Sequence, residues 1–337
     1  MSVHSIRRSL VAAVRSTMLW AALLGVLAAC SSGDGATTDR PAPDDLVAVV
    51  ASFDVAVGPP SRFLVGLLTA DQRGVVFGAV EERFSYLGTK DQPIAEPVAG
   101  PPVVATFLAI PGTDVPPDSV AKPRAVTGSV ARGVYSSEVG FDKAGFWQVE
   151  VAAEVAGQVR RATAAFGVGA DHVVPFVGDA APASENLTMA STDAPLAAVD
   201  SRGGSGAIPD SELHSTTVAA ALAAKRPVVV AVSTPVYCAS RFCGPVTDMV
   251  QELSHAYGDR ASFVHIEVYR DFQADPQVFN RAAIEWIYPS GTGDINEPWV
   301  WVVGADGKVV ARLDNVATRG ELEPILQQLP VIGPAAT

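Results

Sequence analysis

Two cysteines, Cys238 and Cys243, stand five positions apart between a continuous apolar segment and a helical repeat. The apolar segment covers residues 226–233, and such unbroken hydrophobicity is typical of a central strand that is buried on both faces. After the cysteines, apolar residues recur at helical spacing from Val246 to Tyr257. The chain must therefore pass from a buried strand, through a cysteine-containing loop, into an amphipathic helix.

The segments around this junction alternate between strand and helix patterns. Asp306-Gly307 predicts a tight turn between two strands, and Thr318 with Glu321 predicts a capping box at the start of the last helix. The order is strand, cysteine loop, helix, strand, helix, hairpin and helix. The expected elements besides the central strand are helices at 217–225 and 276–287, a strand at 262–269, and hairpin strands at 299–303 and 308–313.

The stretch from about residue 46 to 168 reads as all-β. Residues 146–155 alternate between apolar and polar side chains, and after Ala156-Gly157 the alternation resumes through Val168. About seven short strands with Gly and Pro between them favour an antiparallel sandwich. Tyr135 followed by Gly145-Phe146-Trp147 loosely resembles the end of immunoglobulin-like modules, which implies a β-sandwich with a structural or docking role.

The first thirty residues have the pattern of an export signal. Arg7, Arg8 and Arg15 precede an apolar segment from Met18 to Leu27, and Leu27-Ala-Ala-Cys30 follows at once. The last four residues resemble the lipobox of bacterial lipoproteins. That resemblance implies cleavage before Cys30 and a diacylglyceryl anchor on its sulfur, whereas the alternative is an ordinary cleaved signal with an incidental cysteine.

Cysteine count and net charge limit the functions that remain. The chain has three cysteines, so lipidation of Cys30 leaves Cys238 and Cys243 as the only pair, either a disulfide or a metal or redox site. The formal net charge is −12, which repels phosphate backbones and anionic lipids. We therefore expect no nucleic-acid partner, and attachment to the membrane through the lipid anchor alone.

The C-terminal pattern resembles the thioredoxin-like fold over residues 212–330. Three features carry the resemblance: Cys238 just past a strand end, Pro245 in the first turns of the next helix, and Glu297-Pro298-Trp299 before the hairpin. In that family a cis-proline lies against the cysteine pair, so Pro298 is expected to be cis. The resemblance implies that Cys238 attacks a substrate disulfide, Cys243 resolves the mixed disulfide, and Pro298 presents backbone to a bound peptide.

The spacing of the cysteines departs from the usual family motif, because four residues separate them instead of two. A regular helix cannot bridge cysteines at this spacing, so either Cys238 lies in the loop before the helix or the first turn is distorted. Gly244-Pro245 favours a helix that begins at Pro245, with both cysteines ahead of it. Arg241, between the cysteines, would favour the thiolate, as would the nearby helix N-terminus.

Two other functions compete with a redox role. Spaced cysteines on this fold also resemble the Sco-type copper chaperones, and the alternative copper ligands here would be Cys238, Cys243 and His265. The third hypothesis is a binding module in which the cysteines form a structural disulfide. We expect His214 and His255 at the surface and, outside the copper alternative, no cofactor.

These observations predict a multidomain chain, with an N-terminal antiparallel β-sandwich and a C-terminal α/β thioredoxin-like domain. Its function would be that of a thiol–disulfide oxidoreductase held at the extracytoplasmic face of the cell membrane. Its partners would be exported thiol or disulfide proteins, and a reducing role would require a membrane electron donor. The expected boundaries are a signal peptide at 1–29, a tether at 30–45, the immunoglobulin-like sandwich at 46–170, a linker or redoxin-like extension at 171–211, and the thioredoxin-like domain at 212–330.

Overall fold

The computed structural model describes residues 45–113, 115, 122–127, 132–238, 240–291 and 294–333. Cys30 and the expected signal segment lie outside the described residues. No helix in the described part of the chain is long and apolar enough to cross a membrane.

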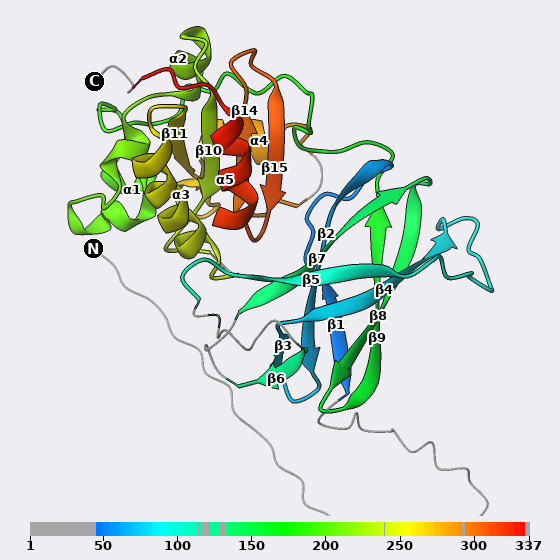
Figure 1. Cartoon of the computed structure of the whole chain (residues 1–337). Helices are drawn as coiled ribbons and strands as arrows, with labels where there is room; N and C mark the ends of the chain where they lie inside the picture. The colour runs from blue at the N-terminus through cyan, green and yellow to red at the C-terminus, as the bar shows by residue number, and fades with distance from the viewer. Residues whose placement is uncertain are drawn as a thin grey trace, which may run out of the picture. The chain divides into compact units, whose positions relative to one another are not determined.

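One antiparallel sheet contains all the strands of the N-terminal half (Figure 1). Along the sheet the order is β6-β3-β2-β7-β5-β4-β8-β9, and β1 pairs with β2. The strands are β1 (Leu46–Val50), β2 (Gly58–Thr69), β3 (Gly74–Val76), β4 (Ala79–Gly88), β5 (Val103–Ala109), β6 (Arg124–Val126), β7 (Gly133–Phe141), β8 (Gly145–Val155) and β9 (Gln158–Val168).

The hairpin formed by β8 and β9 shows how the sequence builds this sheet. Val149 and Val151 on β8 are fully buried, while the residues between them are more exposed, as a period of two requires. The turn residues Ala156 and Gly157 both have positive φ, which matches the twist of the flanking strands. The alternation and the turn predicted for these strands are confirmed. The apolar side chains of this face gather around Phe63 in a single hydrophobic core.

The core of this sheet also contains a carboxylic acid. Glu82 on β4 is fully buried, and its Oε2 accepts a hydrogen bond from Ser137 Oγ at 2.7 Å. None of the described residues makes a hydrogen bond to its Oε1. Burial raises the pKa of Glu82 to about 7, because the ionised form loses most of its hydration.

A second sheet of four strands forms in the C-terminal half, in the order β11-β10-β14-β15. The central strand β10 pairs in parallel with β11 and antiparallel with β14, and β14 pairs antiparallel with β15. A further two-stranded sheet joins β12 to β13. These strands are β10 (Val228–Ser233), β11 (Ser262–Glu267), β12 (Tyr269–Asp271), β13 (Val278–Phe279), β14 (Trp299–Val303) and β15 (Val309–Asp314).

Helices cover both faces of the four-stranded sheet. Val230 on β10 belongs to the core that contains Trp286 of α4, whereas Val229 belongs to the opposite core, with Val250 of α3 and Leu322 of α5. The near-continuous apolar segment was therefore a correct indication of a strand buried on both faces. The helices are α1 (Leu196–Val199), α2 (Val218–Ala223), α3 (Cys243–Tyr257), α4 (Arg281–Ile287) and α5 (Arg319–Gln328), with 3₁₀ helices η2 (Ser201–Ser205) and η3 (Ser211–His214).

The expected fold class, a β-sandwich followed by an α/β thioredoxin-like domain, is wrong. The chain is mostly β, with 38% strand and 18% helix, and its largest unit is one sheet of nine strands instead of two packed sheets. Period-two alternation locates strands but not their partners, and here β7 pairs with both β2 and β5, which joins the strands into one sheet. Only five α-helices occur in the described residues, and α1, α2 and α4 are short, so the C-terminal half is not a clear α/β thioredoxin domain.

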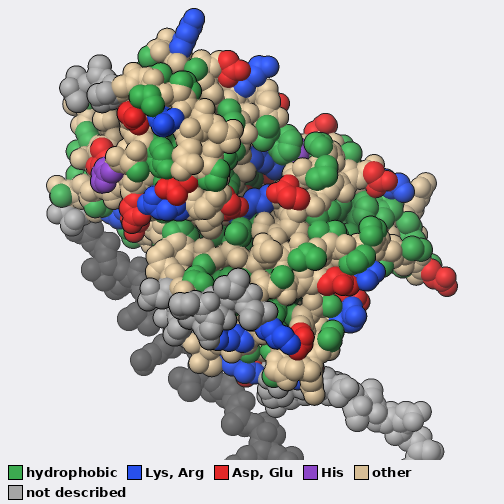
Figure 2. Space-filling model, viewed as in Figure 1, with side chains coloured by type: hydrophobic (Ala, Val, Ile, Leu, Met, Phe, Trp, Pro, Cys, Tyr) green, Lys and Arg blue, Asp and Glu red, His purple; other side chains and the backbone are tan. Residues whose placement is uncertain are grey.

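One expected helix is also much shorter than its sequence pattern. The helix predicted for residues 276–287 begins only at Arg281, because Val278–Phe279 pairs with β12 as the strand β13. The capping box at Thr318 and the hairpin across Asp306-Gly307 are both confirmed. On the face drawn in Figure 2, acidic, basic and apolar side chains are interspersed over the surface.

Candidate functional site

The two cysteines lie where β10 passes into α3, and they form a disulfide with a Cα–Cα distance of 6.0 Å. The helix begins at Cys243 and not at Pro245, so the prediction that both cysteines precede it is wrong. Pro245 is then the third residue of the helix. At that position a missing N–H costs nothing, because the first four amides have no partner within the helix.

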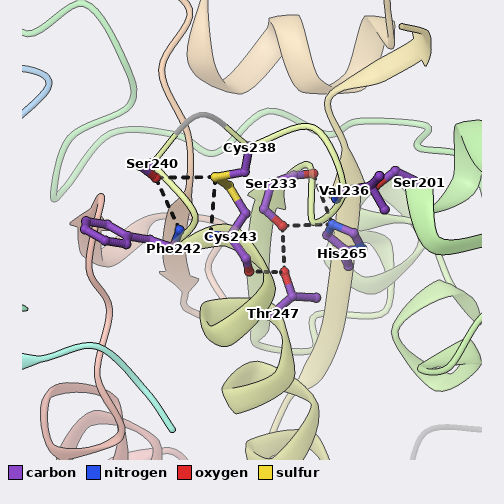
Figure 3. The surroundings of a disulfide bond; sticks show 9 residues. All are labelled: Ser201, Ser233, Val236, Cys238, Ser240, Phe242, Cys243, Thr247 and His265. Carbon is purple, nitrogen blue, oxygen red and sulfur yellow. Dashed lines mark hydrogen bonds between the residues drawn. A yellow bond between two sulfur atoms is a disulfide. The ribbon is translucent and has the colours of Figure 1, made fainter. Parts of the chain in front are cut away.

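The two sulfur-bearing residues differ in exposure. Cys243 is fully buried, whereas Cys238 lies in the loop before the helix and is partly exposed. The Cys243 backbone N–H donates to Cys238 Sγ at 3.4 Å, and Ser240 Oγ lies 3.3 Å from the same sulfur (Figure 3). Arg241 is exposed and has a φ of 64°, in the left-handed region. The loop thus presents Cys238 at the N-terminus of α3, where partial positive charge favours a thiolate.

The peptide bond between Glu297 and Pro298 is cis, as predicted from the sequence. Pro298 is buried, and its carbonyl accepts a hydrogen bond from the Asn315 N–H at 2.8 Å. A carboxylate oxygen of Glu297 and the two sulfur atoms all lie within 4.8 Å of one another. Sequence reasoning singled out the proline but missed this carboxyl group, although its place directly before the proline was the available signal.

The carboxyl group of Glu297 has a higher pKa than an ordinary glutamate side chain. Burial, together with the negative charge of Glu267, raises the pKa of Glu297 to about 7. Glu267 ends β11, is itself buried, and accepts a hydrogen bond from the Ser201 N–H at 2.9 Å. A group that gains and loses a proton near neutral pH therefore stands beside the disulfide.

His265 contacts the cysteines only through intermediates. Its Nε2 lies 2.9 Å from Ser233 Oγ, which lies 2.7 Å from Thr247 Oγ1, and Thr247 donates to the Cys243 carbonyl at 2.8 Å (Figure 3). The metal-ligand groups found among the described residues do not join His265 to the two sulfurs. The structure thus does not bring the copper set of Cys238, Cys243 and His265 together as one ligand group.

The remaining histidine predictions have opposite outcomes. His255 is exposed, as predicted, and lies 2.7 Å from a carboxylate oxygen of Glu212. His214 is fully buried, so its predicted surface position is wrong. It lies with His265, Asp200 and Asp210 in a buried polar cluster that sequence reasoning missed.

Aromatic side chains lie next to the cysteine loop. Tyr237, which precedes Cys238, stacks on Phe272 with ring centroids 4.0 Å apart, and Tyr269 packs edge-on against Phe272 at 4.9 Å. Val236 is 53% exposed. These residues give the accessible cysteine a partly exposed apolar border.

A comparison with family models finds no match to this chain, and comparisons with curated proteins and with solved structures find none either. The function therefore has to follow from the geometry of the site.

Proposed function

We propose that this chain is a thiol–disulfide oxidoreductase that acts on exported proteins through Cys238 and Cys243. The observation that carries the proposal is the unequal burial of the two cysteines: Cys238 is accessible to a partner, whereas Cys243 is fully buried beside it. An accessible sulfur can be attacked or can attack, and a buried one within bonding distance can release a bound partner.

In the reducing direction the first step is attack by the Cys238 thiolate on a substrate disulfide. The Cys243 N–H at 3.4 Å and the N-terminus of α3 stabilise the negative charge on this sulfur. A bond forms between Cys238 Sγ and one substrate sulfur, and the substrate disulfide breaks. The second substrate sulfur leaves as a thiolate and takes up a proton.

In the second step Cys243 attacks Cys238 Sγ and releases the substrate. The buried Cys243 thiol must first lose its proton, and the Glu297 carboxylate within 4.8 Å is placed to accept it. The substrate is reduced by two electrons to a dithiol while the cysteine pair becomes a disulfide. The same steps in reverse oxidise an exported dithiol.

Partner selection follows from the surroundings of Cys238. The apolar border formed by Val236, Tyr237 and Phe272 favours unfolded or extended segments with exposed apolar side chains. A folded partner with a recessed disulfide would have less access to this loop.

The test is to trap the mixed disulfide. In a Cys243→Ser variant the substrate cannot be released, so reduced full-length protein incubated with oxidised insulin should accumulate a covalent adduct on a non-reducing gel. The matched Cys238→Ser variant should form none, because Cys243 is buried; both variants also carry Cys30→Ser, so that no third thiol can react. Equal adducts in both variants, or none in either, would overturn the proposal and leave the disulfide as a structural link.

We further propose that Cys30 anchors the protein at the extracytoplasmic face of the membrane, on the basis of the Leu-Ala-Ala-Cys motif after a short apolar segment. The chain should incorporate labelled palmitate and sediment with membranes. A Cys30→Ser variant should lose the label. Labelling that persists in this variant would refute the anchor.

A further inference from the structure

Four side chains converge in the interior of the C-terminal half, away from the disulfide. Asp200 precedes η2, Asp210 and His214 bracket η3, and His265 lies on β11. All four are fully buried. One donor atom from each lies within 4.8 Å of the others, so the cluster gathers two carboxylate oxygens and two imidazole nitrogens at one point.

Four of the six distances between these donor atoms match the edges of a tetrahedral zinc site, and the other two are no longer than 4.8 Å. The distance from His265 Nδ1 to Asp200 Oδ2 is 3.3 Å, and from the same nitrogen to His214 Nε2 it is 3.4 Å. His214 Nε2 lies 3.6 Å from both Asp200 Oδ2 and Asp210 Oδ1. Zinc binds such atoms at about 2.0–2.2 Å, which corresponds to tetrahedral edges of about 3.3–3.6 Å.

The hydrogen bonds of His265 leave its Nδ1 facing a carboxylate. Its Nε2 lies 3.2 Å from the Ser233 carbonyl, which can only accept, so Nε2 carries a proton. Nδ1 of the neutral imidazole then carries a lone pair, and this lone pair points toward Asp200 Oδ2 and His214 Nε2. Acceptors that face one another in the interior are stabilised by a cation between them, which is either a proton on His214 or a metal ion.

A second observation also indicates a missing ligand. Asp210 is fully buried, and none of the described residues makes a hydrogen bond to its Oδ1; the distance of 3.6 Å from this oxygen to His214 Nε2 is too long for a hydrogen bond. Its other oxygen, Oδ2, accepts from Arg202 at 2.5 Å. Arg202 therefore holds the carboxylate in place while Oδ1 faces the other donors of the cluster.

The charge of the cluster is also suited to a divalent cation. The carboxylates of Asp200, Asp210 and Asp248 surround the single guanidinium of Arg202. Three carboxylates against one guanidinium leave an excess of negative charge, and two of these carboxylates, Asp200 and Asp210, are fully buried. A dication would balance this excess, and Arg202 would act as the outer hydrogen-bond donor that orients the ligands.

We propose that Asp200, Asp210, His214 and His265 form a structural Zn²⁺ site. Two imidazole nitrogens and two carboxylate oxygens are all possible zinc ligands, and four ligands from the protein leave no open position for a substrate, as in structural zinc sites. Bound zinc would link the segment around η2 to β11. Because the Ser201 hydroxyl accepts a hydrogen bond from the Val236 N–H at 3.2 Å, the zinc would also steady the start of the cysteine loop.

The test is zinc titration of the full-length protein after chelator treatment, with the disulfide oxidised so that no thiolate can compete for metal. Calorimetry and native mass spectrometry should find one zinc per chain at micromolar concentration, and bound zinc should raise the thermal midpoint. Asp210→Asn and His214→Gln should weaken binding by more than about 100-fold, since outer-shell substitutions alone cost about 10–100-fold. His255→Gln, which changes an exposed histidine, should bind as the unaltered protein does.

Cobalt provides a readout that does not depend on how well the variants fold. Co²⁺ bound to the unaltered protein should give the strong visible absorption of a tetrahedral ion, without a thiolate charge-transfer band. An octahedral spectrum, no binding at micromolar metal, or equal binding by a folded His214→Gln variant would each overturn the proposal. The result is separate from the redox function, since Cys238→Ser should keep the zinc.

Discussion

Replacement of Glu297 by Gln gives the sharpest test of how the buried cysteine loses its proton. With a pKa of about 7, the Glu297 carboxyl is about 90% ionised at pH 8 and about 1% ionised at pH 5. The rate at which Cys243 releases a bound substrate should therefore be roughly 90-fold lower at pH 5 than at pH 8 and should level off above about pH 8. Glutamine cannot accept a proton, so the variant should be about 10²–10⁴-fold slower at pH 8.

Stopped-flow reaction of the reduced protein with a chromogenic aromatic disulfide separates the two steps. The first release of coloured thiol reports attack by Cys238, and the second reports resolution by Cys243. Only the rate of the second phase should change in Glu297→Gln. That rate should keep rising with pH above 8, because the Cys243 thiol then ionises without a base. Glu96→Gln, at an exposed position, is the matched control. A second phase with the same pH profile in both proteins would refute the role assigned to Glu297.

Three further predictions concern stability. Because burial raises the folded-state pKa of Glu82 from 4.5 to about 7, its contribution is present below pH 4.5 and is lost as pH rises through 7. The loss amounts to as much as about 3 kcal/mol, and urea unfolding of Glu82→Gln at pH 5 and pH 8 should lack this pH dependence. The Cys238→Ser/Cys243→Ser double variant should lose about 2 kcal/mol by the same measurement, because the disulfide closes a short loop; a larger loss would favour a mainly structural bond. Thr318→Ala should cost about 1 kcal/mol through loss of the capping box that begins α5, whereas no change would show that the cap is dispensable.

The sequence predicted helices and strands well where buried side chains recur at a regular spacing along the chain. The alternation in β8 and the continuous apolar segment of β10 are direct consequences of one buried face and two buried faces, respectively. The late start of α4 at Arg281 was harder to see. The sequence pattern predicted a helix from Pro276, but Val278 and Phe279 pair with β12 as the strand β13 instead.

The pairing of distant strands and the buried polar cluster could not be predicted in the same way. Alternation fixes which face of a strand is buried, but the pairing of β2 with β7 joins residues far apart in sequence. Asp200, Asp210 and His214 lie in a stretch of short 3₁₀ helices without periodicity, so nothing local indicated that they meet His265. Glu297 did have a local signal, its place directly before Pro298, but its nearness to the two sulfur atoms depends on contacts between distant parts of the chain.

The reduction potential of the Cys238–Cys243 disulfide tests the central claim most directly. The full-length protein would be equilibrated in dithiothreitol and glutathione buffers of graded potential, and its free thiols counted after alkylation. A redox-active pair predicts a midpoint less negative than about −300 mV, within reach of extracytoplasmic thiol partners. A midpoint more negative than about −300 mV would identify a structural disulfide and contradict the proposed function.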